Sequence, residues 1–140
     1  NDEKHQAHNS ILDDLPFALP ALTRAYKLQK RCAKVGFDWD NPQSVFHKVE
    51  EELQEVWNEM VQSPVQAEKL EEELGDLLFV STNLCRHYGI DAESCLRKAN
   101  AKFERRFRGV EQLVKSQQKQ VSDCSLNELD VLWNEIKSRE

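Results

Sequence analysis

Apolar residues recur along most of the chain at the three- and four-residue spacing of amphipathic helices. Prolines, glycines and polar turn signals divide this pattern into four long segments and one short final segment. The pattern predicts helices over about 20–34, 42–62, 65–88, 91–115 and 126–137. Short turns between the long helices force neighbours to run antiparallel, so we expect an all-α four-helix bundle with a short C-terminal helix.

The ends of several segments carry their own signals. Asp91 is a candidate N-cap for the fourth helix, and Ser125 with Glu128 fits a capping box for the last one. The opening residues, NDEKHQAHNSILDD, are polar and show no periodicity. We therefore expect residues 1–15 to be a linker or disordered segment, and residues 16–140 to form one domain.

Composition narrows the function classes. The net charge of −6 argues against nonspecific nucleic-acid binding, which needs a basic surface. No apolar run approaches the ~18 residues of a membrane span. The four cysteines are scattered and contain no C-x-x-C pair, which is typical of reduced thiols in a cytoplasmic protein.

Two acidic pairs, Glu52-x-x-Glu55 and Glu73-x-x-Asp76, lie in the second and third predicted helices. Counted at helical periodicity, each helix has an apolar arc with carboxylates along the same flank, Glu52 at its edge and Asp76 about 60° outside it. If the two arcs face each other, both pairs open onto one cleft.

Four carboxylates brought this close repel by roughly 3 kcal/mol for each close pair, a cost that a bound cation would offset. Ligands that are all oxygen suit a hard cation, Mg²⁺ or Mn²⁺. The alternative is a plain solvated face, since glutamate-rich helices are common. The spacing alone leaves both interpretations open.

A basic cluster and a tryptophan follow. Lys102 and Arg106 share one helix face and could hold two phosphates, or could form salt bridges to the acidic helices. Trp133 could stack on a nucleobase or pin the last helix to the bundle. His47 and His87 have no acidic residue three positions before them, so the Glu-x-x-His pattern of di-iron bundles is absent at both.

The runs LPALTRAYKLQKRCAKVGFDW, KVEEELQEV, EELGDLLF and KANAKFERRF closely resemble MazG, a family of all-α nucleoside triphosphate pyrophosphohydrolases. The resemblance is strong over about residues 19–108, and is greatest to the C-terminal domain of bacterial two-domain MazG proteins. It implies that residues 16–140 are a catalytic domain cut from a longer protein, and that the domain forms a homodimer.

The resemblance also implies a reaction and a site. The reaction is Mg²⁺-dependent cleavage of a nucleoside triphosphate to a monophosphate and pyrophosphate, by water attack at the α-phosphorus. The implied metal ligands are Glu52, Glu55, Glu73 and Asp76, with Glu51 or Glu55 as proton acceptor; the implied substrate contacts are Lys48, Lys69, Lys102, Arg106 and Trp133. Alternatives are a non-catalytic dimerisation or regulatory module, and a hydrolase specialised for dUTP or modified nucleotides.

Overall fold

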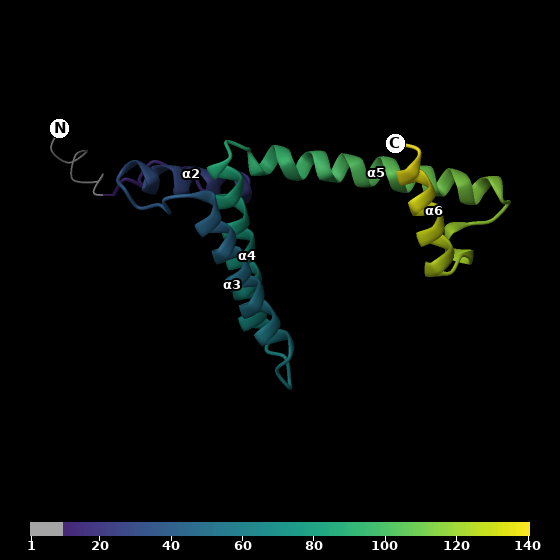
Figure 1. Cartoon of the computed structure of the whole chain (residues 1–140), viewed down its shortest axis with the longest axis horizontal. Coiled ribbons are helices and arrows are strands. Elements are labelled where there is room, and N and C mark those ends of the chain that lie inside the picture. The colour runs from purple at the N-terminus through teal and green to yellow at the C-terminus, as the bar shows by residue number, and fades with distance from the viewer. Residues whose placement is uncertain (1–9) are drawn as a thin grey trace. The chain divides into compact units, whose positions relative to one another are not determined.

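The computed structural model describes residues 10–140, which contain helices and, within that range, no strand. The elements are α2 (Ala21–Lys34), α3 (Pro42–Met60), α4 (Ala67–His87), α5 (Ala92–Ser116), a 3-10 turn η1 (Val121–Asp123) and α6 (Leu126–Ser138) (Figure 1). The predicted all-α fold, with four long helices and a short last one, is confirmed. The observed ends lie within about two residues of the predicted ones. None of the described helices is long and apolar enough to cross a membrane.

Residues at the helix ends account for these boundaries. The Asn41 side chain accepts a hydrogen bond of 2.8 Å from the backbone N–H of Ser44, and Pro42 fills the first position of α3, which needs no N–H donor. Gly36 (φ +89°) and Gly89 (φ +67°) follow α2 and α4 in the left-handed conformation that ends a helix. Asp91 accepts from the backbone N–H of Glu93, in agreement with its predicted capping role.

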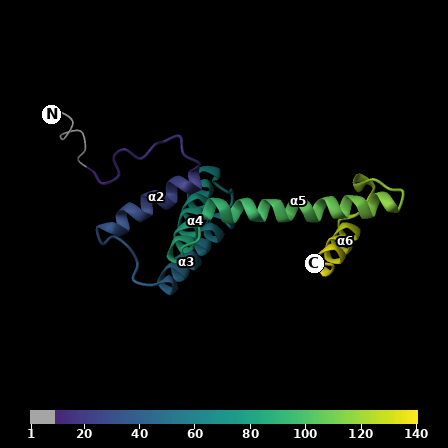
Figure 2. The same cartoon turned by 90° about the horizontal axis from the view of Figure 1, so that it is seen from above.

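The chain divides into two compact units after Glu93. In the first unit, α3 and α4 form an antiparallel hairpin, and α2 packs against α4 (Figures 1 and 2). Val45, Val56 and Val80 are buried there. The buried Gln29 of α2 donates a 2.8 Å hydrogen bond to the carbonyl of Phe79, which ties α2 to α4.

The predicted linker, residues 1–15, is described only from residue 10 onward, and residues 1–9 lie outside the described part. Its described end is bound to α2. The Arg31 guanidinium donates to the carbonyls of Ile11 (3.1 Å) and Asp13, and the Leu15 side chain is buried. Residues 10–15 therefore belong to the packed surface of the first unit.

The second unit consists of α5 from Ser94 onward, η1 and α6. Val110, Val114 and Leu132 form its buried core, and Trp133 and Ile136 pack against them. The helices approach closely at Gly109, where an added Cβ would lie 2.8 Å from the Ile136 side chain. Ser125 caps α6 through the Glu128 N–H, whereas the Glu128 carboxylate lies 3.8 Å from Lys119 Nζ; the two-way capping box occurs one turn earlier, between Gln120 and Asp123.

The apolar arcs predicted to face each other are only partly covered. Val56 is 5% exposed, but Leu53, Trp57 and Leu78 are 55–60% exposed in the single chain. The contact between α3 and α4 therefore buries one edge of each arc and leaves a wide apolar surface open. Periodicity identifies an apolar face, but it does not say how much of that face a neighbouring helix covers.

Candidate metal centre

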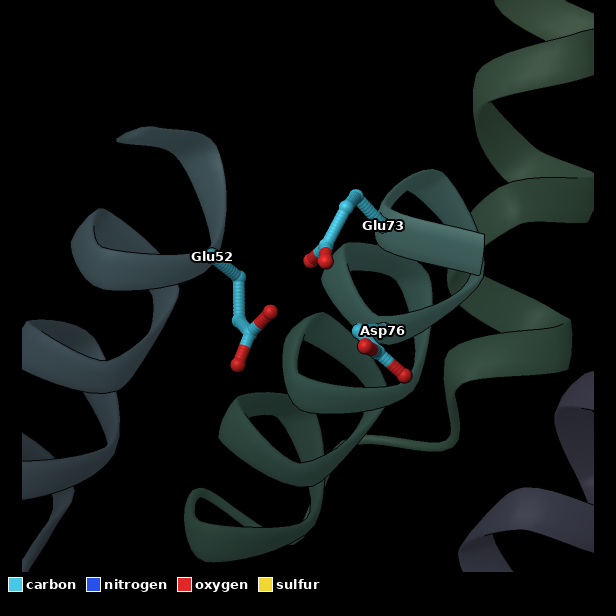
Figure 3. A group of neighbouring side chains, drawn as sticks. All are labelled: Glu52, Glu73 and Asp76. Atoms are coloured by element: carbon cyan, nitrogen blue, oxygen red, sulfur yellow. The ribbon is translucent and has the colours of Figure 1, made fainter. Parts of the chain in front are cut away.

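Three of the predicted ligands meet between α3 and α4. Glu52 projects from α3 toward α4, which carries Glu73 and Asp76 one turn apart (Figure 3). One carboxylate oxygen of each residue lies within 4.8 Å of those of the other two. Two helices thus bring together three oxygen ligands that are well separated in the sequence.

Exposure changes across this cluster. The Glu52 side chain is only 12% exposed, Glu73 is half-buried and Asp76 is exposed. The carboxylates therefore form a group with a protected inner member and an open side toward Asp76. Such an arrangement leaves room for an ion to bind substrate and water as well as protein oxygens.

The cluster is electrostatically unfavourable when it holds no cation. The pKa of Glu73 is raised, first by burial and then by the negative charges of Asp76, Glu55 and Glu52. Glu55 is exposed and is not one of the three residues whose oxygens meet, yet its charge acts on Glu73. Oxygen donors with excess negative charge suit a hard divalent cation.

One lysine offsets part of this charge. Lys48 Nζ lies 3.2 Å from Glu51 Oε2 and 3.4 Å from Glu52 Oε1. These contacts raise the pKa of Lys48, so its ammonium is held in the charged form. Glu51 is thus paired with Lys48 and lies outside the three-carboxylate group, although it directly precedes Glu52.

The remaining predicted substrate contacts lie elsewhere. Lys69 is exposed on α4, and Lys102 is exposed on α5 in the second unit. Arg106 binds Glu140 through Nη2 (2.7 Å) and Nε (3.1 Å), which lowers the pKa of Glu140 despite its partial burial. The ring centroids of Trp133 and Phe103 lie 5.4 Å apart, and Cζ of Arg106 lies 5.8 Å from the centroid of the Trp133 ring.

Arg106 and Trp133 therefore have structural roles inside the second unit. Arg106 forms its salt bridge with Glu140, just beyond α6, and not with the acidic helices α3 and α4. Trp133 pins α6 to α5, which is the structural alternative that the sequence leaves open for it. An arginine held against an aromatic ring still presents donors suited to phosphate. Their part in substrate binding stays a prediction.

A second polar group was not predicted from the sequence. Asp38 Oδ1 lies 2.6 Å from Arg86 Nη2 and 2.9 Å from His87 Nε2, which joins the turn after α2 to the end of α4. Burial raises the pKa of Asp38, but the bonds from Arg86 and His87 outweigh it and hold this pKa below 3.8. Because Asp38 is far in the sequence from Arg86 and His87, no short-range motif in the sequence indicates this contact.

Comparisons with known proteins show similarity to one family over the part of the chain that contains the cluster. A family model, the MazG nucleotide pyrophosphohydrolase domain, matches residues 40–110, the range that contains the carboxylate cluster. The chain is 49% identical over 139 residues to a nucleoside triphosphate pyrophosphohydrolase of Escherichia coli strain K12, covering 99% of this chain and 53% of that protein. It is 37% identical over 135 residues to the nucleoside triphosphate pyrophosphohydrolase/pyrophosphatase MazG of Thermotoga maritima, covering 96% of this chain and 51% of that protein.

A longer relative also matches. The uncharacterized protein YabN of Bacillus subtilis is 43% identical over 138 residues, which is 28% of its length. The chain thus spans about half the length of the two pyrophosphohydrolases and less of YabN. The similarity covers the cluster and both units, because nearly all of this chain is aligned in each case.

Proposed function

The chain belongs to the MazG nucleotide pyrophosphohydrolase family, and we propose that it hydrolyses nucleoside triphosphates to a nucleoside monophosphate and pyrophosphate. The observation that carries this proposal is the meeting of Glu52, Glu73 and Asp76 oxygens within 4.8 Å across two helices. The two relatives that the chain covers by about half are both named as nucleoside triphosphate pyrophosphohydrolases, which supports the same reaction.

We propose Mg²⁺ as the cofactor, with Mn²⁺ as a substitute, held by Glu52, Glu73 and Asp76 with help from Glu55. The three carboxylates fit such an ion because they offer only oxygen and carry more negative charge than Lys48 offsets. When bound, the metal would supply a Lewis acid that acidifies a water and neutralises phosphate charge.

The protein's own residues would then orient the substrate and accept a proton from the attacking water. We propose Glu55 as the acceptor of the proton from the attacking water, because it is exposed and its charge raises the pKa of Glu73. Glu51 is less suited to this role because its carboxylate is paired with Lys48. Lys48 contacts Glu52, and we propose that a phosphate oxygen of the substrate replaces one of the carboxylate partners of Lys48.

The second unit carries three further residues that we propose for substrate binding. Lys102 and Arg106 would bind phosphates, and Trp133 would stack on the base. Glu140 occupies Nε and Nη2 of Arg106, so a phosphate would bind the remaining donors of the guanidinium or displace Glu140. Lys69 is a further exposed cation on α4, in the helix that carries Glu73 and Asp76.

We also propose that the protein acts as a homodimer. The exposed large apolar side chains of α3 and α4 are Phe46, Leu53, Trp57, Met60, Leu74, Leu78 and Phe79. A patch of this kind is typical of an interface, because exposed apolar clusters of several large residues are rare on monomers. The cytoplasmic location drawn from the cysteines stays a prediction.

Product identification tests the reaction directly. A panel of canonical, deoxyuridine and modified nucleoside triphosphates is incubated with Mg²⁺ and the products are separated by chromatography. Monophosphate with pyrophosphate supports the proposal, and the best substrate distinguishes a general hydrolase from a specialised one. Diphosphate with phosphate contradicts it, and no product from any substrate favours the non-catalytic module.

A further inference from the structure

A recess on α2 gathers positive charge away from the carboxylate cluster. It encloses about 330 Å³, within the range of small-molecule sites of about 300–1,000 Å³. Its lining consists of Leu15, Pro16, Leu19, Lys27, Lys30, Arg31 and Lys34. Four of these seven residues are cationic and none is acidic, in a chain whose net charge is −6.

The lysines of the recess have no ion-pair partner among residues 10–140. This differs from Lys48, Arg86 and Arg106, each of which has a carboxylate within 3.4 Å. The dipole of α2 favours cations in its last turn, which accounts for Arg31 and Lys34. It does not account for Lys27 and Lys30, which lie farther from the helix end.

Two arginines shape the recess without neutralising it. Arg31 donates to the carbonyls of Ile11 and Asp13, and Arg24 Nε donates to the carbonyl of Pro16 at 3.3 Å. These bonds hold residues 11–16 against α2 and so build the opposite wall. Because carbonyl oxygens carry no net charge, the arginines orient this wall and keep their positive charge.

We propose that this recess binds an oligophosphate anion, either free pyrophosphate or the phosphate chain of a nucleotide. Lys27 and Lys34 are seven residues apart on one helix, or about 10 Å along its axis, so linked phosphates can contact more of the cations than a single one can. The apolar wall of Leu15, Pro16 and Leu19 can accept a less polar group attached to the phosphates. The recess shares no residue with the carboxylate cluster and contains no metal ligand, so its binding needs neither a divalent ion nor hydrolysis.

The test is pyrophosphate binding in buffer with EDTA, measured by calorimetry on the full chain. A variant with Lys27→Gln, Lys30→Gln and Lys34→Gln should bind at least about tenfold more weakly, because three charge contacts are lost. A control with Lys98→Gln, Lys115→Gln and Lys137→Gln has the same net charge and alters exposed lysines of the second unit. It should bind within about twofold of wild type.

Several results would overturn the proposal. The proposal fails if wild-type protein does not bind pyrophosphate without metal. It also fails if both triple variants weaken binding equally, because that result would reflect net charge alone. Circular dichroism checks that the recess variant is folded; if it is not, the single Lys27→Gln variant must weaken binding where Lys98→Gln does not.

The source of the phosphates is resolved by comparing ligands under the same metal-free conditions. Tighter binding of a nucleoside triphosphate than of pyrophosphate identifies a nucleotide ligand, and equal or weaker binding identifies free oligophosphate. Affinity that keeps rising with the length of a single-stranded oligonucleotide would replace the proposal with a nucleic-acid surface. Hydrolysis is measured separately with Mg²⁺, so failure of the proposed reaction and failure of this site are distinguishable.

Discussion

Glu73 shows the electrostatic cost of bringing the carboxylates together. It is half-buried between Glu52 and Asp76, and its pKa is raised by burial and by the charges around it. A carboxyl with a raised pKa stabilises the fold below its unfolded pKa, and this contribution is lost as pH rises through the folded pKa. Near neutral pH the ionised Glu73 therefore destabilises the metal-free protein.

Replacing Glu73 with glutamine should separate stability from metal binding. In EDTA at neutral pH, Glu73→Gln should raise the melting temperature, because one of the repelling charges is removed. The same variant should lose most of the further rise that Mg²⁺ gives to wild type, since a ligand stabilises only the state that binds it. Thermal melts with EDTA and with Mg²⁺ measure both effects.

Glu71→Gln serves as the control, because Glu71 is an exposed glutamate of α4 outside the cluster. It should leave both the metal-free melting temperature and the Mg²⁺ response close to wild type. A Glu73→Gln protein that melts lower in EDTA, or that keeps the full Mg²⁺ response, would contradict this electrostatic explanation.

The sequence predicts which residues belong to the site better than it predicts which side chains contact one another. The acidic pairs and the family resemblance predicted four ligands, Glu52, Glu55, Glu73 and Asp76. The oxygens of three of them meet, and those of Glu55 do not join the group. The sequence could not show that Glu51 pairs with Lys48, since side-chain rotamers decide which neighbour a glutamate contacts. Nor could it reveal the Asp38–Arg86 contact or the recess on α2, which depend on residues distant in the chain.

At the scale of elements, the interior of α4 contains a glycine, Gly75, although no neighbouring atom excludes a side chain at that position. Gly75 has open space around the position of a Cβ, and a helix-interior glycine costs roughly 0.5–1 kcal/mol relative to alanine. Gly109 in α5 is different, because a Cβ there would lie 2.8 Å from Ile136 Cδ1.

Gly75→Ala should therefore raise the free energy of unfolding by about 0.5–1 kcal/mol. Gly109→Ala should gain less than this or lose stability, because the Ile136 side chain must move to make room. Urea unfolding of both variants measures the difference. A clear loss of stability in Gly75→Ala would mean that something outside the single chain approaches the backbone of α4.

Helix boundaries were predicted closely because local residues determine them. Asn41, Pro42, Gly36 and Gly89 act at their own positions, so their signals are visible without a structure. How much of each apolar helix face is buried by a neighbouring helix was not predictable in the same way. Leu53 and Val56 belong to one apolar arc, yet one is 56% exposed and the other 5%, because only tertiary packing distinguishes them.

At the scale of the whole molecule, the exposed arc of α3 and α4 is the feature that a single chain leaves unsatisfied. We expect wild-type protein to have twice the chain mass of 16.3 kDa by light scattering. Trp57→Glu should give monomers, because it places a charge on the proposed interface. Leu126→Glu, at an apolar residue of α6 that is 73% exposed, should remain dimeric. A monomeric wild-type protein would contradict the proposed dimer.

The whole account depends on one claim, that the carboxylates of α3 and α4 act together as a metal-dependent hydrolytic site. The most direct measurement is the rate of pyrophosphate release from a nucleoside triphosphate with Mg²⁺, compared among wild type, Glu52→Gln, Asp76→Asn and Glu50→Gln. Glu50 is an exposed neighbour bonded to His47, so it controls for loss of one charge from α3.

We expect release by wild type to require Mg²⁺, and Glu52→Gln and Asp76→Asn to slow it at least about 100-fold, since each removes a ligand of the proposed ion. Glu50→Gln should stay within about twofold of wild type. Pyrophosphate release that persists in EDTA, or that survives both cluster substitutions in folded protein, would contradict the central claim.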